Sequence, residues 1–222
     1  MASWMVHLRV ADKLLDHIEG IRETEFIVGN IAPDSGVPNA DWTVYTPPKD
    51  VSHFKTYLAD GTSIIDVQTY LRQYFTAEKR ADYSREQYSF YLGYLTHLLT
   101  DREWVAHIYK PSIARYPEAY AADSYKLLWT LKKDWYDLDF LYLKKHPDFR
   151  AFHIYENAMG FINTYMYIFA EDAFENRREY ITGFYRGGRE DIEREYQYLT
   201  EAQADRFVED CVEAVLEKLE GI

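Results

Sequence analysis

Apolar residues recur at helical spacing along nearly the whole chain, and this pattern limits the fold more than any other feature. Met5, Leu8 and Leu15, for example, lie near one stripe of the first predicted helix. No segment shows the sustained two-residue alternation that is typical of a half-buried strand. We therefore predict an all-α fold, a multi-helix bundle that forms a single domain over residues 1–222.

Turn and capping signals indicate where the predicted helices begin and end. Ser84 and Gln87 have the spacing of a capping box, so we expect a helix from there to about Asp101. Residues 25–52 differ, because two glycines and four prolines make a helix unlikely. We expect a long N-terminal loop there, which is functional or mobile in a compact domain. The predicted helices span residues 4–18, 63–75, 84–101, 121–145, 148–169, 171–182, 189–197 and 201–219.

The chain is acidic, with 37 Asp and Glu against 25 Lys and Arg and a formal charge of −12. This charge repels phosphate backbones and anionic membrane surfaces, so we expect no strong nucleic-acid binding. The one cysteine, Cys211, excludes a disulfide framework and a zinc site built on paired cysteines. No signal peptide is visible, and the uncharged runs are too short to cross a bilayer. We therefore predict a cytoplasmic protein without a transmembrane segment.

His97 and Asp101 are the first candidates for chemistry. Four residues apart on a helix, they lie on the same face and can hold one cation together. They lie in a segment that is apolar on nearly every side, where an unpaired imidazole or carboxylate is costly to bury. A simple hydrogen bond between the two side chains would satisfy them equally well.

Three further residues become informative as a set. Asp34 follows an apolar run at a Pro/Gly turn, where an Asx-turn is the ordinary alternative. His53 closes the same loop, and His7 lies on the first predicted helix. Each of them alone is more often structural. With His97 and Asp101 they form the ligand set of a hydrolytic zinc site, in which Asp101 can bridge two ions.

Four short segments together resemble the zinc-dependent phospholipase C family, whose fold is shared by fungal single-strand nucleases. A fifth segment, residues 134–140, looks like part of the small cytosolic bacterial members. The resemblance implies a helical fold and a metal-dependent hydrolase. The four segments are Ser3–His7, Gly29–Asp34, Ser52–Phe54 and Gly93–Asp101.

The resemblance implies a ligand set for one or two metal ions. Asp34, His53, His97 and Asp101 would surround one ion, and His7 would join a second ion that Asp101 bridges. In secreted members the free amino terminus completes that second site. Here the chain begins six residues before His7, so we expect this ligand to be missing.

A third ion is not expected, because the family's later His and Glu, four residues apart, have no counterpart in this chain. His107 has the spacing of the first ligand of that third site. Asp134 is a possible substitute ligand, although Asp134, Asp137 and Asp139 would equally form a solvated acidic face.

The function implied is zinc-dependent hydrolysis of a phosphodiester or phosphomonoester, with Asp34 as the general base. The substrate would be a small phosphoester or a lipid headgroup. Other divalent metals would accept similar ligands. Trp42, Tyr45 and Phe54 are candidates for lining the pocket.

Two alternatives stay open. In the first, the chain is a non-catalytic helical protein in which the His/Asp cluster only organises the core. The second is a single-strand nuclease, which needs a basic groove. Lys132, Lys133, Lys144 and Lys145 supply the one local basic density, and a solvated helix face explains them better.

Overall fold

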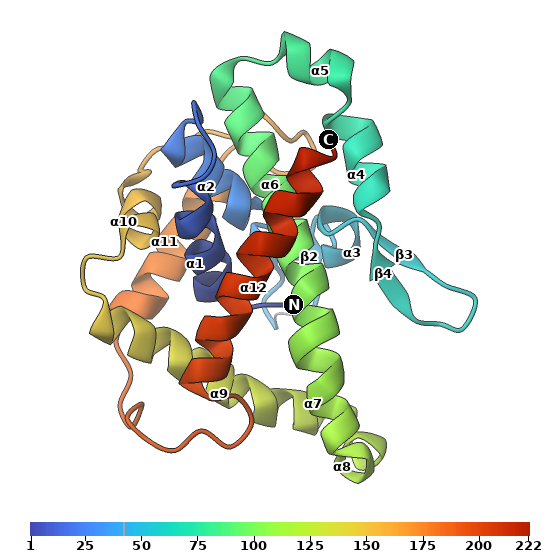
Figure 1. Ribbon diagram of the computed structural model, residues 1–222, viewed down its shortest axis with the longest axis vertical. Coiled ribbons are helices and arrows are strands. Elements are labelled where there is room, and N and C mark those ends of the chain that lie inside the picture. The colour runs from blue at the N-terminus through green and yellow to red at the C-terminus, as the bar shows by residue number, and fades with distance from the viewer. Residues whose placement is uncertain (42) are drawn as a thin grey trace.

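The computed structural model describes residues 1–41 and 43–222, and it confirms the predicted all-α class (Figure 1). The longer helices are α1 (Trp4–Leu14), α2 (Glu23–Ile31), α4 (Val67–Tyr74), α6 (Arg85–Trp104), α9 (Ser124–Lys145), α10 (Arg150–Asn157), α11 (Ala173–Arg186) and α12 (Glu201–Glu220). The short ones are α3 (Lys49–Ser52), α5 (Ala77–Asp82), α7 (Lys110–Arg115), α8 (Pro117–Ala122), a 3₁₀ turn η1 (Ala32–Asp34) and a π-helical turn η2 (Val105–Tyr109).

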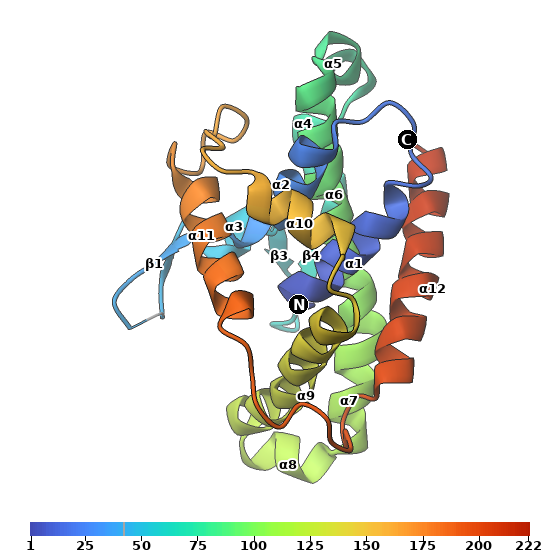
Figure 2. The same ribbon diagram turned by 90° about the vertical axis from the view of Figure 1, so that its left-hand side faces the viewer.

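Helix α6 runs through the middle of the molecule and continues into η2 and α7 (Figures 1 and 2). It begins at the expected capping box, in which the Ser84 hydroxyl accepts from the Gln87 N–H and the Gln87 side chain accepts from the Ser84 N–H. From Ser89 to Asp101 every residue is buried, because α1, α2, α4 and α12 all pack against this helix. A helix that is apolar all round is stable only when it is surrounded in this way.

The expectation of a loop over residues 25–52 is wrong at its start, because α2 is a helix of nine residues. Gly29 does not end this helix but allows it to contact α6. A Cβ at Gly29 would lie 2.2 Å from the Phe90 carbonyl oxygen, and one at Gly93 would lie 2.1 Å from the Phe26 carbonyl oxygen. The two backbones therefore touch at a pair of glycines, and this crossing places the end of α2 against the middle of α6.

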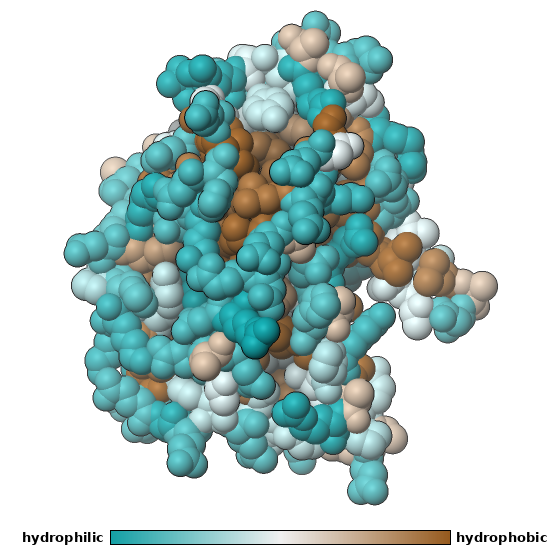
Figure 3. Space-filling model, in the orientation of Figure 1, coloured by the Kyte–Doolittle hydropathy of each residue, from teal (hydrophilic) through white to brown (hydrophobic). Residues whose placement is uncertain are grey.

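Two small hairpins follow α2 in place of the rest of the loop. Strand β1 (Val37–Pro38) pairs antiparallel with β2 (Tyr45–Thr46), and β3 (Lys55–Tyr57) pairs antiparallel with β4 (Ser63–Ile65). The helix predicted from residue 63 therefore begins only at α4. The β3–β4 hairpin projects from the body of the molecule and carries apolar side chains on its surface (Figures 1 and 3).

The predicted helices at 148–169 and 189–197 are also wrong in extent. Helix α10 ends at Asn157, and residues 189–197 are not helical. Gly160, Gly188 and Asp191 have positive φ angles, which interrupt a right-handed helix. Among the described residues, no helix is long and apolar enough to span a membrane.

Candidate metal centre

Five side chains from four parts of the chain meet in the interior, where α1, η1 and the residue after α3 face α6. His7 comes from α1, Asp34 from the end of η1, His53 from just after α3, and His97 and Asp101 from α6. The side chain of Asp34 is 10% exposed, and the other four side chains are fully buried. The structure thus brings together the five residues that the sequence singled out.

Asp101 lies between the three imidazoles. Its Oδ1 is 3.3 Å from His7 Nε2, and its Oδ2 is 3.5 Å from His97 Nε2 and 3.7 Å from His53 Nε2. The two oxygens of one carboxylate therefore face different imidazoles. This is the arrangement that a carboxylate bridging two cations requires.

The cluster contains two groups of possible ligands, which share His97. In one, His7, His97 and Asp101 have ligand atoms within 4.8 Å of one another, and in the other the same holds for Asp34, His53 and His97. Asp34 Oδ1 lies 3.5 Å from His53 Nε2. The rings of His7 and His97 stack with centroids 3.7 Å apart.

Main-chain carbonyls fix the protonation of two of the imidazoles. His97 Nδ1 lies 2.7 Å from the Asn30 oxygen, and His53 Nδ1 lies 3.0 Å from the Lys49 oxygen. A carbonyl only accepts hydrogen bonds, so each Nδ1 carries a hydrogen and each neutral ring has its lone pair on Nε2. These two Nε2 atoms are 3.3 Å apart. Two lone pairs at this distance repel each other unless a proton or a cation lies between them.

Several atoms of the cluster lack the hydrogen bonds that buried polar atoms normally form. Among the described residues, both ring nitrogens of His7 and Oδ2 of Asp101 have no hydrogen-bond partner. Buried polar atoms without a partner are rare in native proteins and often mark an ion or water. Three imidazoles and two carboxylates are ligands that zinc takes, so the residues present fit a zinc site.

At His7 and Asp101 the electrostatics favour the protonation states that a metal needs, whereas the contact with Asp101 outweighs burial and raises the pKa of His97. Burial lowers the pKa of His7 to about 4, and the neighbouring His97 adds to this effect. Burial alone would raise the pKa of Asp101, but its interaction with the neighbouring His7 outweighs this effect and holds the pKa well below its usual range. At neutral pH His7 is therefore neutral and Asp101 ionised, as metal binding requires.

The first residues of the chain lie beside the cluster. The Ala2 N–H donates to Asp101 Oδ1 at 2.8 Å. The α-amino group of Met1 is buried nearby, and burial lowers its pKa while Asp101 opposes this shift. Ser3 anchors this segment, because its hydroxyl donates to Asp139 Oδ1 at 2.7 Å.

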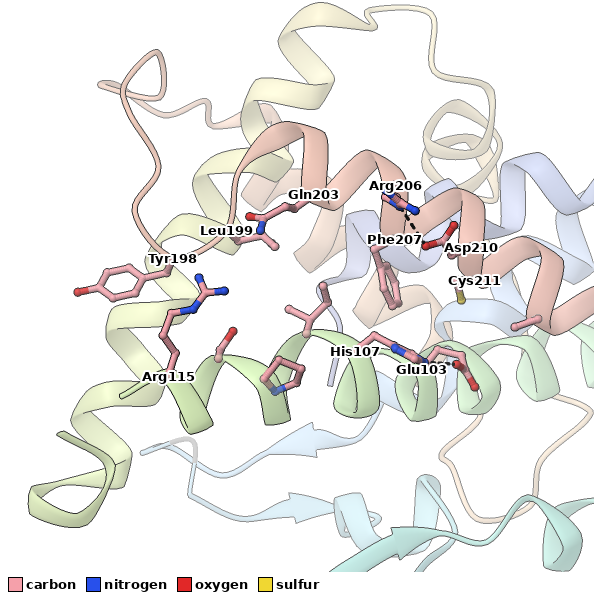
Figure 4. A pocket seen from close by; sticks show the side chains of 14 residues that line it. Glu103, His107, Arg115, Tyr198, Leu199, Gln203, Arg206, Phe207, Asp210 and Cys211 are labelled. Atoms are coloured by element: carbon pink, nitrogen blue, oxygen red, sulfur yellow. Dashed lines mark ion pairs between the residues drawn. The ribbon is translucent and has the colours of Figure 1, made fainter. Parts of the chain in front are cut away.

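The structure does not bring His107 to the cluster. Six residues after Asp101 it lies roughly 240° further round a helix of 3.6 residues per turn, on a different face. It is exposed, its Nε2 lies 3.2 Å from Glu103, and it faces a groove of about 400 Å³ between α6–α7 and α12 (Figure 4). None of the five clustered residues lines this groove.

Asp134 is also occupied elsewhere, because its Oδ1 accepts from Arg194 and its Oδ2 from the Tyr198 N–H, both at 2.7 Å. It anchors the segment between α11 and α12. We therefore leave His107 and Asp134 out of the candidate metal centre.

A small cavity of about 70 Å³ gives access to the cluster from one side. Asp34 is the cluster member among its described lining residues, which also include residues 1–4, Lys49, Lys132 and Tyr136. Burial lowers the pKa of Lys132, and the charge of Lys49 adds to this effect. Tyr45 and Phe54 are not among the described lining residues, and Trp42 lies outside the described residues.

The protein is thus a helical bundle that encloses three imidazoles and two carboxylates able to hold a metal ion. The family model described as zinc dependent phospholipase C matches residues 6–183. The chain therefore belongs to the zinc-dependent phospholipase C family, which confirms the resemblance seen in the sequence, and its His/Asp cluster is compatible with zinc. No curated protein and no solved structure matches the chain.

Proposed function

We propose that this chain is a phosphoester hydrolase of the phospholipase C type that works with one or two zinc ions. The observation that carries the proposal is the pair of Nε2 atoms of His53 and His97, held 3.3 Å apart while main-chain carbonyls occupy both Nδ1 atoms. A cation bound between the two lone pairs removes their repulsion, as a shared proton also would. The family match supports the same class of reaction.

The residues of the site have distinct roles in this proposal. Zinc, when bound, supplies Lewis acidity that polarises a phosphoryl oxygen and makes a water molecule more acidic. Asp34 faces the cavity and accepts the proton of the attacking water as general base. Burial would raise the pKa of Asp34, but its interaction with the neighbouring His53 outweighs this effect and lowers the pKa, so the carboxylate is ionised. Asp101 holds His7 and His97 in place through separate oxygens.

The size of the cavity limits what part of a substrate enters. The cavity of about 70 Å³ is small, so we expect the phosphoryl group of a substrate to enter it and any acyl chain to stay outside. The organic part of the substrate stays outside. The substrate is therefore a small phosphoester or the headgroup of a lipid, and a cytoplasmic location stays a prediction.

Metal analysis of purified protein tests the proposal. We expect one or two equivalents of zinc in the wild type and in His17→Ala, which changes an exposed histidine, and loss of zinc in His97→Ala. Protein should be purified without chelator or affinity tag. Wild type without metal, even after reconstitution with zinc, would contradict the proposal.

Assays of phosphoester hydrolysis distinguish an enzyme from a protein in which the bound metal only organises the core. We expect the zinc-loaded wild type to hydrolyse chromogenic phosphoesters, EDTA to abolish this activity, and added zinc to restore it. Bound zinc without hydrolysis of any phosphomonoester or phosphodiester would favour the structural alternative.

A further inference from the structure

Two lysines from distant elements meet at the cavity beside the candidate metal centre. Lys49 lies on α3 and Lys132 on α9, and both line the cavity together with Asp34. The sequence suggested that the lysines of α9 form a solvated face. Lys132 departs from this expectation, because it is half-buried and reaches inward.

Neither ammonium group has an acidic partner within ion-pair distance in the described part of the chain. Three other lysines of α9 each have one: Lys133 pairs with Asp137, Lys144 with Glu193 and Lys145 with Glu201. Other described lysines without an ion pair, such as Lys110 and Lys126, are exposed, whereas Lys49 and Lys132 are half-buried.

Aromatic rings hold both ammonium groups without neutralising them. Lys49 Nζ lies 4.4 Å from the centre of the Tyr45 ring, and Lys132 Nζ lies 4.9 Å from that of Trp129. A cation over an aromatic face keeps its full charge for another partner. The one carboxylate of Asp34 that shares the cavity opposes these two positive charges only in part, which leaves a positive charge for a further anion.

We propose that Lys49 and Lys132 bind the phosphate group of a phosphomonoester, free or on a lipid, and thereby select monoesters over diesters. The inference rests on the proposed function and names its substrate class. Asp34 lines the same small cavity, so a phosphoryl group that enters it meets the lysines and Asp34 together. A monoester offers them a dianion with three non-bridging oxygens, whereas a diester offers one charge and two such oxygens.

Binding of inorganic phosphate tests the lysines without any turnover. Calorimetric titration of the zinc-loaded full chain should show affinity reduced at least about fivefold by Lys49→Met and by Lys132→Met, because hydrogen bonds to a charged partner are strong. Lys132→Arg keeps the charge and should bind within about threefold of the wild type. Lys126→Met, an exposed lysine on α9, is the matched control and should leave the affinity unchanged.

Zinc content is measured for every variant, so that loss of the metal is not mistaken for loss of the lysines. Replacing the Lys49 side chain keeps the hydrogen bond between the main-chain carbonyl of Lys49 and His53 Nδ1. Equal phosphate affinity in wild type and double variant, with zinc in place, would overturn the inference. Absence of phosphate binding by the zinc-loaded wild type would do the same.

Turnover of paired substrates tests the selectivity. For the double variant we expect kcat/KM on p-nitrophenyl phosphate to fall about tenfold or more, mainly through KM. On bis(p-nitrophenyl) phosphate we expect a change of less than about threefold. An equal loss on both esters would overturn the selectivity. Glycerol 3-phosphate compared with phosphatidic acid in mixed micelles distinguishes a free from a lipid-borne monoester.

The two proposals fail separately. If phosphate binding depends on the lysines but no ester is hydrolysed, the anion site is supported and the proposed hydrolase activity is contradicted. If the lysine variants hydrolyse phosphoesters as the wild type does, the hydrolase activity is supported and the anion site is contradicted.

Discussion

Asp101 is the residue on which the candidate metal centre depends most, because its oxygens face different imidazoles. Asp101→Asn keeps the size of the side chain and removes its charge. Changes in groups that only support a metal ligand cost about 10- to 100-fold in metal affinity, so we expect this variant to lose at least about 100-fold. Competition with a chromogenic chelator measures the zinc affinity.

Asp210→Asn is the control for this prediction, because Asp210 is an exposed acid whose partner is the surface residue Arg206. Its zinc affinity should equal that of the wild type. If Asp101→Asn bound zinc as tightly as this control, Asp101 would not be a ligand.

At the residue scale the sequence located side chains but not the groups that orient them. The five clustered residues were visible because imidazoles and carboxylates in this order are informative as residue types. The acceptors for His97 and His53 are main-chain carbonyls, those of Asn30 and Lys49, and no side-chain pattern marks a carbonyl. The direction in which Lys132 points depends on the packing of α9, which local sequence does not determine.

The crossing of α2 and α6 positions Asn30 and Asp34, so damage to this contact should reach the metal centre. A Cβ at Gly93 would lie 2.1 Å from the Phe26 oxygen, a distance that only separation of the two helices relieves. We expect Gly93→Ala to lower the free energy of unfolding by at least about 2 kcal/mol and to reduce zinc occupancy. Urea unfolding and metal analysis measure these two effects.

Gly183 is a matched control within α11, because a Cβ there would meet nothing within 4 Å. Gly183→Ala should leave zinc occupancy unchanged and stabilise the protein by up to about 1 kcal/mol through helix propensity. Equal stability of the two variants would show that the crossing tolerates a methyl group.

At the scale of elements, helices with local signals were predicted and those that depend on distant contacts were not. The capping box of Ser84 marked the start of α6 correctly. Gly29 was interpreted as a breaker because its role, contact with α6, lies outside its own segment. The β3–β4 hairpin was assigned in part to a helix, since three-residue strands are too short to show alternation.

For the whole molecule, net charge and local charge lead to opposite conclusions. A total of −12 disfavours anionic partners, whereas Lys49 and Lys132 make one cavity favourable to a phosphate. Composition sums charges over the whole surface, but binding depends on the few that line a cavity.

Asp139 connects three helices and makes the stability of the whole molecule depend on pH. It lies on α9, its Oδ1 accepts from Ser3 at the start of α1, and its Oδ2 accepts from the Tyr185 hydroxyl of α11 at 2.8 Å. Burial raises the pKa of Asp139 to about 7, although the hydrogen bonds from Ser3 and Tyr185 oppose this. In the unfolded chain an Asp has a pKa of about 3.9.

Between pH 4 and 7 the folded protein therefore holds a proton that the unfolded chain has released, so stability from this group falls as pH rises. Asp139→Asn does not titrate. We expect the free energy of unfolding of Asp139→Asn, minus that of the wild type, to increase by about 1–3 kcal/mol from pH 5 to pH 8. Urea unfolding at each pH measures this difference, and EDTA removes the contribution of bound zinc to stability. A difference that stays constant with pH would mean that Asp139 is ionised in the folded protein throughout this range.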